Sequence, residues 1–319
     1  MKEKILQELI NNKDKLITGT YIAEHLNITR SYVSKVINEF ISSGHVIDIQ
    51  DRSGYIYRNS NKHINITKKD INHEINNIYI LDKVDSTNKY LKELANNGEN
   101  EITVVIAKEQ TAGRGRLGRS FVSNSGKGIY MSILLRPTFG IELSKRITSL
   151  TATAVSEAID EVTELNTKIK WVNDIYVNDK KLAGILTEGH TNFESGKVEY
   201  IVVGIGINLY KQEFPDNLDN IITTVEDETN KVFSINKIIE SILNKLIYYY
   251  ENIKDNIHIN EYRKRSYVIN KNVELNIHGN IKYGKVLDID DEGELIVLIN
   301  DKKETIYSGE ITKVRLKDE

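Results

Sequence analysis

Residues 168–189 read KIKWVNDIYVNDKKLAGILTEG. Apolar residues lie on both sides of the polar segment NDKK, which is the pattern of an antiparallel hairpin with a tight turn. Strand patterns and helical patterns alternate on both sides of this hairpin, between residues 78 and 270. The stretch therefore predicts a mixed α and β domain built on a largely antiparallel sheet.

The rest of this region supplies further strands and helices. The strands are continuous apolar runs, and the helices show apolar residues at helical spacing. The predicted elements are strands at 103–107 and 128–135, a strand VEYIVVGIGINL at 198–209, a helix that Ser86 or Thr87 can cap, and helices at 143–163 and 235–250.

Length and composition limit the class of protein. A chain of 319 residues with 39% hydrophobic and 28% charged residues is typical of a globular protein of roughly two or three domains. No apolar run approaches the ~20 residues of a membrane span and no signal pattern is present, so we expect a cytoplasmic protein without a membrane partner. The absence of cysteine excludes disulfides and thiolate ligands, and the seven scattered histidines argue against a zinc site.

Residues 1–58 carry the pattern of a winged helix-turn-helix. An amphipathic helix at residues 2–12 precedes a helix-turn-helix at Gly19–Asn38, in which Asn27 can turn the chain and Thr29 can cap the third helix. A hairpin around DRSG follows. Residues 59–77 are polar and nearly without periodicity, which predicts a linker.

The polar face of the third helix predicts contact with DNA. It carries no acidic side chain, and its predicted DNA-binding residues are Thr29, Arg30, Ser31, Tyr32, Ser34 and Lys35. Since the chain has a net charge of −3, DNA contact has to come from such a local patch. The alternative is a small helical module that only packs against other parts of the chain.

Residues 271–319 differ from the region before them. Five short strand patterns are separated by Gly, Asn or Asp turns, a spacing that suits a small β-barrel. A stabilising cap and a functional role both remain open for this segment. The chain as a whole is predicted to be an α+β multidomain protein.

Residues 108–119, KEQTAGRGRLGR, combine glycines with arginines between two predicted strands. Glycine lets backbone N–H groups approach an anion closely, and arginine adds permanent charge and bidentate contacts. The segment therefore predicts a phosphate cradle. It is no Walker loop, because no GKS or GKT follows, and GIGIN at 204–208 is no dinucleotide motif. A disordered nucleic-acid-binding tail is the alternative, which its position inside a folded domain disfavours.

Two further clusters lie on the opening hairpin. In KWVND, Asn173 and Asp174 could ligate Mg²⁺ through oxygen atoms. In KLAGIL, Lys181 could neutralise the charge that grows on an α-phosphate during displacement. For each residue alone, the alternative is a solvated hairpin charge.

Five motifs in this order resemble the biotin–protein ligase family. They are DSTN (85–88), EQTAGRGRLGR (109–119), KWVND (170–174), KLAGIL (181–186) and GIGIN (204–208). The winged helix in front makes the chain similar to the bifunctional subgroup, in which the ligase is also the biotin operon repressor. Lipoate–protein ligases share a related fold but lack the GRGRxGR segment. The resemblance implies a class II synthetase-like ligase domain at 78–270 and an SH3-like barrel at 271–319.

The resemblance also implies roles for individual residues. The residues expected to bind biotin and its adenylate are Ser86, Thr87, Asn88, Gln110, Gly113, Arg114, Gly115, Arg116, Arg119, Lys181, Gly184, Gly204 and Gly206. Lys170, Asn173 and Asp174 are expected to associate with Mg-ATP, and Lys181, Arg116 and Asp174 to act in catalysis. The chain departs from the family at Val172, where a proline is usual.

The activity implied by the resemblance has two steps. ATP and biotin give biotinyl-5′-AMP, which then biotinylates a lysine of the biotin carboxyl carrier protein of acetyl-CoA carboxylase. The adenylate would act as corepressor for a homodimer that it promotes on operator DNA. Two alternatives remain: a ligand-sensing transcription regulator without ligase activity, and a lipoate–protein ligase.

Overall fold

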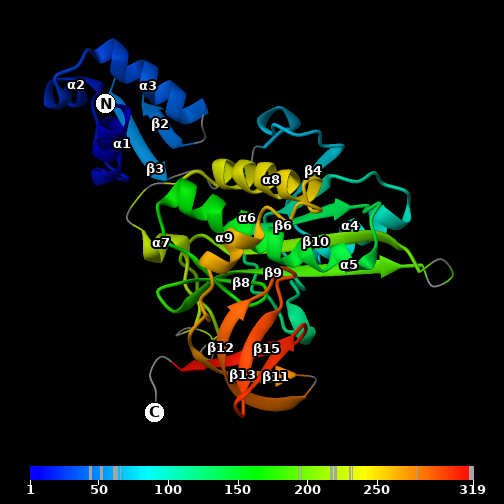
Figure 1. Ribbon diagram of the computed structural model, residues 1–319. Coiled ribbons are helices and arrows are strands. Elements are labelled where there is room, and N and C mark those ends of the chain that lie inside the picture. The colour runs from blue at the N-terminus through cyan, green and yellow to red at the C-terminus, as the bar shows by residue number, and fades with distance from the viewer. Residues whose placement is uncertain are drawn as a thin grey trace. The chain divides into compact units, whose positions relative to one another are not determined.

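The computed structural model of the chain (Figure 1) describes residues 1–42, 45–50, 53–59, 64, 66–192, 194, 196–215, 218, 221–229, 231, 233–277 and 279–315. The chain forms two compact units. The first comprises Met1–Ile66 with Lys231–Ile238, and the second comprises Thr67–Asn230 with Ile239–Glu319.

The first unit is a helix-turn-helix followed by a β-hairpin. Its elements are α1 (Lys2–Asn11), β1 (Leu16–Ile17), α2 (Gly19–Leu26), α3 (Arg30–Ser42), β2 (Val46–Gln50) and β3 (Gly54–Asn59), and its strands pair in the order β1-β3-β2. Asn27 ends α2 in the left-handed conformation with φ 53°, as predicted. The predicted cap is also confirmed, because the Thr29 hydroxyl accepts a hydrogen bond from the Tyr32 N–H.

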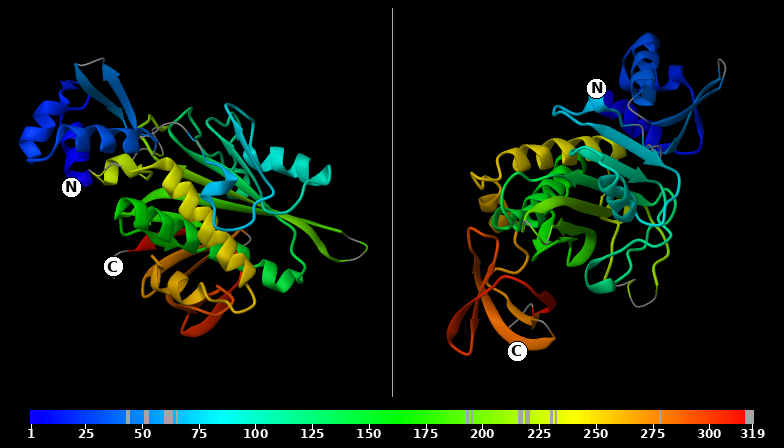
Figure 2. Two further views of the ribbon diagram at one scale, coloured as in Figure 1. Left: turned by 90° about the horizontal axis from the view of Figure 1, so that it is seen from above. Right: turned by 90° about the vertical axis from the view of Figure 1, so that its right-hand side faces the viewer.

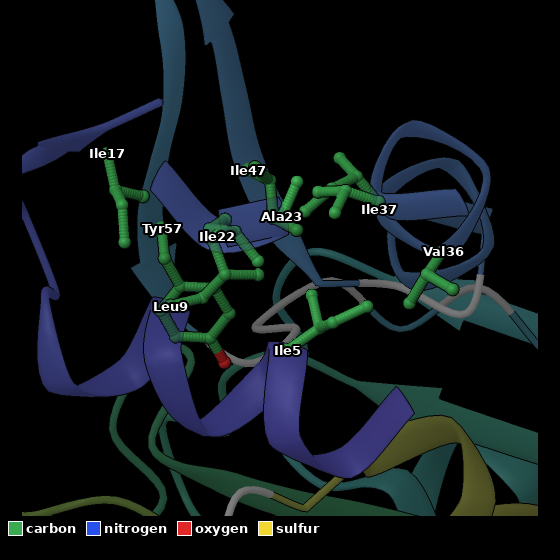
Figure 3. Close-up of a cluster of buried hydrophobic side chains, with 10 residues drawn as sticks. Ile5, Leu9, Ile17, Ile22, Ala23, Val36, Ile37, Ile47 and Tyr57 are labelled. Atoms are coloured by element: carbon green, nitrogen blue, oxygen red, sulfur yellow. The ribbon is translucent and has the colours of Figure 1, made fainter. Parts of the chain in front are cut away.

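Apolar side chains from the three helices and the hairpin meet in one core (Figure 3). Ile5, Leu9, Ile22 and Ile37 have no exposed surface. Burial of each such side chain stabilises the fold by about 1.5–3 kcal/mol, so this packing fixes which face of α3 remains in solvent. The predicted DRSG turn contains Asp51 and Arg52, which lie outside the described residues.

A seven-stranded sheet is the centre of the second unit. Its order is β4-β5-β6-β10-β9-β8-β7; β4 pairs with β5 in parallel and the other neighbours pair antiparallel. The strands are β4 (Asn77–Leu81), β5 (Thr103–Ala107), β6 (Gly128–Leu135), β7 (Lys168–Lys170), β8 (Asp174–Val177), β9 (Lys180–Thr191) and β10 (Val198–Asn208). The predicted bounds of β5 and β6 are confirmed, because both strands are buried along their whole length.

Helices cover both faces of this sheet (Figure 2). One face packs against α4 (Thr87–Asn96), and the other lies under α6 (Arg146–Thr163) and residues 239–251 of α8 (Ile235–Glu251). Shorter helices are η1 (Lys68–Asp70), η2 (Arg116–Gly118), α5 (Ile141–Ser144), α7 (Val225–Glu228) and α9 (Ile259–Lys264). The single helix predicted at 143–163 is therefore wrong at its start, where α5 and α6 meet.

None of the helices in the described part of the chain has the length and apolarity that crossing a bilayer requires.

The hairpin at residues 168–189 contains one more turn than its sequence indicated. The strand predicted before NDKK is divided into β7 and β8, which a tight turn joins, so that Lys170 pairs with Asp174. The peptide bond between Trp171 and Val172 in this turn is cis. Asn178 and Asp179 then connect β8 to β9 with φ values of 43° and 65°, as two-residue type I′ hairpins require.

The chain ends in a β-rich domain. Its strands are β11 (Asn272–Ile277), β12 (Asn280–Ile289), β13 (Leu295–Ile299), β14 (Lys302–Ile306) and β15 (Glu310–Arg315), in the order β14-β13-β12-β11-β15. The SH3-like barrel that the resemblance implied is not confirmed. Within the described residues the order ends at β14 and at β15, and the sheet does not close. Trp171 fixes the β12–β13 turn by donating its indole N–H to the Gly293 carbonyl at 2.9 Å.

Candidate functional site

A cavity of about 630 Å³ opens on the face of the sheet that also packs against α4. This volume is within the usual range for small-molecule sites. The predicted residues that line it are Ser86, Thr87, Asn88, Gln110, Arg114, Gly115, Arg116, Arg119, Lys170, Asn173, Asp174, Lys181, Gly184, Gly204 and Gly206. Gly113 does not line the cavity; it is buried, and a Cβ there would be 2.5 Å from the Phe121 carbonyl oxygen.

Strand register places the three predicted glycines on this one face. Gly204 pairs with Ser132, and Gly206 pairs with Gly184, which in turn pairs with Asp174. Directly paired residues of antiparallel strands point to the same side of a sheet. The strands therefore place three positions without a side chain close together on the face that lines the cavity.

Two of these glycines make room for other side chains. A Cβ at Gly204 would be 2.3 Å from the side-chain oxygen of Asn88, and one at Gly206 would be 2.6 Å from the Phe121 ring. At Gly184 the nearest atoms are 3.4 Å away, in Lys181. All three glycines were expected to admit a ligand to the backbone. All three line the cavity, and Gly204 and Gly206 also make room for the side chains of Asn88 and Phe121.

The start of α4 builds a polar floor for the cavity. Ser86 caps the helix, and the Thr87 N–H donates to the Gln110 side-chain oxygen at 2.8 Å. The Ser132 hydroxyl lies 2.7 Å from the Thr87 hydroxyl and 2.6 Å from the Asn88 side-chain oxygen. Because these groups are bonded to one another and largely buried, they hold fixed orientations.

Glu188 and Lys92 fix the position of the Asn88 side chain. The Asn88 amide donates to Glu188 at 2.7 Å, and Lys92 forms an ion pair with the same carboxylate. Burial alone would raise the pKa of Glu188, but the hydrogen bonds from Lys92 and Asn88 outweigh it and lower that pKa. Glu188 therefore stays charged, and Asn88 cannot easily leave its position above Gly204.

The arginine loop is a turn that backbone hydrogen bonds hold together, and its three arginines differ in their contacts. Backbone bonds join Phe121 N–H to Gly113 and Gly115 N–H to Arg119. Arg116 donates to the Asn173 side-chain oxygen and to the Gly309 carbonyl, both at 3.2 Å.

The other two arginines differ in their partners. Arg119 forms a two-point ion pair with Glu310. Arg114 is exposed and has no carboxylate partner among the residues that the structure describes. It is therefore the arginine of the loop whose charge is open to a ligand.

Lys181 and Asp174 bring opposite charges to the other side of the cavity. The Lys181 ammonium is 2.7 Å from the Asp174 carboxylate. Lys170 is next to them, over the Tyr176 ring at 5.3 Å from its centre, and burial lowers the pKa of this lysine. The Asn173 amide is already engaged, because it accepts from Arg116 and donates to the Ile185 carbonyl at 2.8 Å. Of the two predicted Mg²⁺ ligands, Asp174 thus has the freer oxygen atoms.

The structure adds residues to the site that the sequence analysis missed. An apolar wall consists of Phe121, Phe214, Leu218, Ile221 and Ile222, and the C-terminal domain contributes Glu310, Ile311 and Thr312. A backbone bridge fixes part of this wall, since Lys181 N–H donates to Ile221 at 2.8 Å. The apolar residues around FPDNLDNII in a polar stretch were the available signal in the sequence. Across the described ranges, no group of three or more His, Asp or Glu is placed to hold a metal ion.

The predicted DNA-binding residues are divided between the two sides of α3. Arg30, Ser31 and Lys35 are exposed, as is the capping residue Thr29. Tyr32 instead packs against the core, and Ser34 lies 3.0 Å from the Tyr55 hydroxyl of the hairpin. The exposed part of the predicted set is therefore a small patch with two cations.

Comparisons with known proteins agree with this architecture. The family model described as "Biotin/lipoate A/B protein ligase family" matches residues 80–208, "Biotin protein ligase C terminal domain" matches residues 268–314, and "HTH domain" matches residues 2–56. The chain is 33% identical to the bifunctional ligase/repressor BirA of Bacillus subtilis, over 98% of both chains. It is 28% identical to the biotin–[acetyl-CoA-carboxylase] ligase of Mycobacterium tuberculosis, over 74% of this chain and 88% of that protein.

A solved structure has the same fold. The biotin protein ligase from Aquifex aeolicus, in complex with biotin and ATP, superimposes with a TM-score of 0.65 at 28% identity. The match covers 76% of this chain and 99% of that chain.

The close packing of the Asn88 side chain against Gly204 can be tested by adding a methyl group at position 204. Gly204→Ala should lower the free energy of unfolding by about 1–3 kcal/mol, because the new Cβ overlaps an asparagine that Glu188 holds. Gly189→Ala, where the nearest atom is 3.9 Å away, is the control and should leave stability unchanged or slightly raised. Thermal unfolding of the two variants measures the difference; equal midpoints would show that Asn88 moves freely.

Proposed function

The chain belongs to the biotin–protein ligase family, in its bifunctional ligase/repressor branch, and on this premise we propose that it activates biotin with ATP and transfers it to a protein lysine. The acceptor is the biotin carboxyl carrier protein of acetyl-CoA carboxylase. The observation that carries the proposal is that five separate motifs, DSTN, GRGRLGR, KWVND, KLAGIL and GIGIN, line one cavity. We assign residues 1–58 to DNA binding, 59–77 to a linker, 78–270 to the ligase and 271–319 to the C-terminal domain.

The two ends of the cavity suit the two substrates. The fixed polar floor of Thr87, Asn88 and Gln110 offers donors and acceptors to the ureido ring of biotin. The apolar wall formed by Phe214, Leu218, Ile221 and Ile222 suits the flat adenine base. The carboxylate of biotin and the α-phosphate would then meet between these ends, beside Lys181.

In the first step, a biotin carboxylate oxygen attacks the α-phosphorus and the bond to pyrophosphate breaks. Negative charge grows on the phosphate oxygens during this displacement, and Lys181 is positioned to neutralise it. Asp174 holds the lysine ammonium in place at 2.7 Å. Asp174 would be the residue that holds Mg²⁺, an ion that proteins often bind through one or two carboxylates, and the ion would supply further charge neutralisation when bound.

In the second step, the acceptor amine attacks the acyl carbon, and the bond to the AMP oxygen breaks. The proton of the amine has to leave, and we propose the Asp174 carboxylate as its acceptor. Until then the mixed anhydride has to be kept from water. The arginine loop serves this purpose: Arg116 fixes it across the cavity, and Arg114 reaches the adenylate phosphate.

We extend the proposal to repression of the biotin operon. The helix-turn-helix presents Arg30, Ser31 and Lys35 to solvent on the helix that enters a major groove in this motif. Biotinyl-5′-AMP would act as corepressor by promoting a homodimer, which sets two such helices at half-site spacing.

The ligase proposal is tested by measuring pyrophosphate release from labelled ATP. Wild-type protein should release it with biotin, and Lys181→Met should lower the rate about 100- to 1000-fold because the transition-state charge loses its partner. Lys180→Met, on the exposed neighbouring position, should stay near the wild-type rate. Release with lipoate but not biotin would identify a lipoate ligase, and release with neither would leave a ligand-sensing regulator.

The arginine loop gives a separate prediction. Arg114→Ala should still make biotinyl-5′-AMP but release it into solution faster, because the exposed Arg114 side chain has no carboxylate partner among the described residues and its removal breaks no ion pair there. Arg116→Ala should slow synthesis as well, since it loses the contacts to Asn173 and Gly309. Filtration of the complex without acceptor measures the bound fraction. Wild-type retention by Arg114→Ala would contradict the role given to this arginine.

The repressor proposal is tested on DNA from upstream of the biotin biosynthesis genes. Binding should tighten when biotin and ATP are present, and Lys35→Ala should weaken it at every sequence and reduce the salt slope by about one. Lys4→Ala, an exposed lysine on α1, is the control. An affinity for DNA that changes neither with salt concentration nor with biotin would refute this part of the proposal.

A further inference from the structure

A series of cations and aromatic rings runs from the cavity to the start of the C-terminal domain. The Lys170 ammonium lies over the Tyr176 ring, 5.3 Å from its centre. That ring stacks on the Tyr267 ring, with the two centroids 5.3 Å apart and the planes inclined by 24°. The Lys271 ammonium lies over the Tyr267 ring at 3.7 Å from its centre. Each ring therefore contacts one cation and the other ring.

The register of the β7–β8 hairpin brings Lys170 and Tyr176 together. Lys168 pairs with Tyr176 and Lys170 pairs with Asp174, so these side chains lie on one face. Lys170 and Tyr176 are diagonal neighbours on that face, at a separation that a long side chain can span. Both line the cavity, and Tyr176 is only 8% exposed. The Tyr176 ring is therefore a wall of the cavity against which the lysine side chain lies.

Three contacts outside the cavity fix Tyr267. Its N–H donates to the Ile169 carbonyl at 2.8 Å, which joins its segment to the edge strand β7. Its hydroxyl donates to the Asp179 carboxylate in the β8–β9 turn at 2.7 Å. The third contact is the Lys271 ammonium over the ring. Because Tyr267 is held at these points, it also restricts the Tyr176 ring that stacks on it.

Lys170 differs in its partners from the other lysine of the cavity. Lys181 is paired with Asp174, whereas none of the described residues forms an ion pair with Lys170. An aromatic face attracts a cation electrostatically, and more strongly where both are partly removed from water. Lys170 is half-buried, so the Tyr176 ring orients its ammonium without neutralising it. The charge of Lys170 thus remains available to an anionic ligand.

The charges of the two nucleotides indicate which group Lys170 meets. ATP carries three phosphates, and biotinyl-5′-AMP keeps the α-phosphate, to which the proposed function assigns Lys181 and Arg114. Lys170 is a further cation in the same cavity, so the pyrophosphate part of ATP is the anion left for it. A lysine side chain is long and flexible, and ordering it on a ligand costs conformational entropy. A ring that orders the side chain beforehand lowers that cost.

We propose that Tyr176, held by Tyr267, is a positioning residue that directs Lys170 to the pyrophosphate part of ATP. The inference rests on the proposed function, in which ATP occupies this cavity. The tyrosines act through the lysine and contact none of the reacting atoms. Since pyrophosphate leaves in the first step, the stack affects the binding of ATP and not the later transfer of biotin to the acceptor.

Replacement of the Tyr176 ring tests this role. Tyr176→Leu should raise the KM for ATP about 5- to 10-fold in biotin-dependent pyrophosphate release and leave kcat nearly unchanged, because ground state and transition state lose the same contact. Tyr176→Phe keeps the ring and should retain the wild-type KM. Transfer from added biotinyl-5′-AMP to the acceptor protein should keep its wild-type rate in both variants.

Tyr200→Leu is the matched control. The Tyr200 ring stacks on His190 and lies below Arg136, whose guanidinium carbon is 5.8 Å from the ring centre, but it does not line the cavity. This variant also loses a buried, stacked ring, so its thermal midpoint should fall as in Tyr176→Leu. Its KM for ATP should stay at the wild-type value.

A double-mutant cycle with Lys170→Met shows whether the ring acts through the lysine. In the Lys170→Met background, Tyr176→Leu should change the KM for ATP less than about 2-fold. The full increase in that background would overturn the proposal, and so would an unchanged KM in Tyr176→Leu alone or an equal increase in Tyr176→Phe. Absence of pyrophosphate release in the wild-type protein would refute the proposed function, and this inference with it.

Discussion

The guanidinium group of Arg116 connects the three segments on which the site depends. It binds the side chain of Asn173 in the β7–β8 turn and the carbonyl of Gly309 before β15, and it belongs to the arginine loop itself. Each of these acceptors is partly buried, and an unpaired buried acceptor costs about 1–3 kcal/mol. The loop, the turn and the C-terminal sheet therefore keep their positions together.

A second constraint acts from the floor of the cavity. The Lys92–Glu188–Asn88 chain of contacts fixes the start of α4, and the absence of a side chain at Gly204 lets that helix approach the sheet. The charged side chains of Lys181 and Asp174 lie between the arginine loop and the polar floor of the cavity. Reactive groups are thus positioned by strands and a helix end and are covered by a turn, which combines a rigid base with an accessible mouth.

The sequence predicted the elements that depend on local patterns. Strands β5 and β6 were found with correct bounds, because a continuously buried strand is a continuous apolar run. The cap at Thr29 was also found, and the cap of α4 was narrowed to Ser86 or Thr87, of which Ser86 is the one observed, since capping is decided by residues within one turn. The five motifs at the site were recognised because they occur along the chain in the order typical of one family.

The remaining features depend on contacts distant in sequence. The pairing of Asn88 with Gly204, of Arg116 with Gly309 and of Arg119 with Glu310 follows from strand register and domain packing, which one sequence does not contain. The same holds for the open strand order of the C-terminal domain, which strand spacing alone could not distinguish from a barrel. The break between α5 and α6 leaves no proline or glycine as a signal.

The close contact between Asn88 and Gly204 also constrains how this family can change over evolutionary time. A Cβ at position 204 would occupy the space of the Asn88 side-chain oxygen, so a larger residue there becomes tolerable only after position 88 has become smaller. The reverse order passes through an overpacked intermediate. The two positions, 116 residues apart in sequence, are thus expected to show order-dependent epistasis, and a chain that retains the asparagine is expected to retain the glycine.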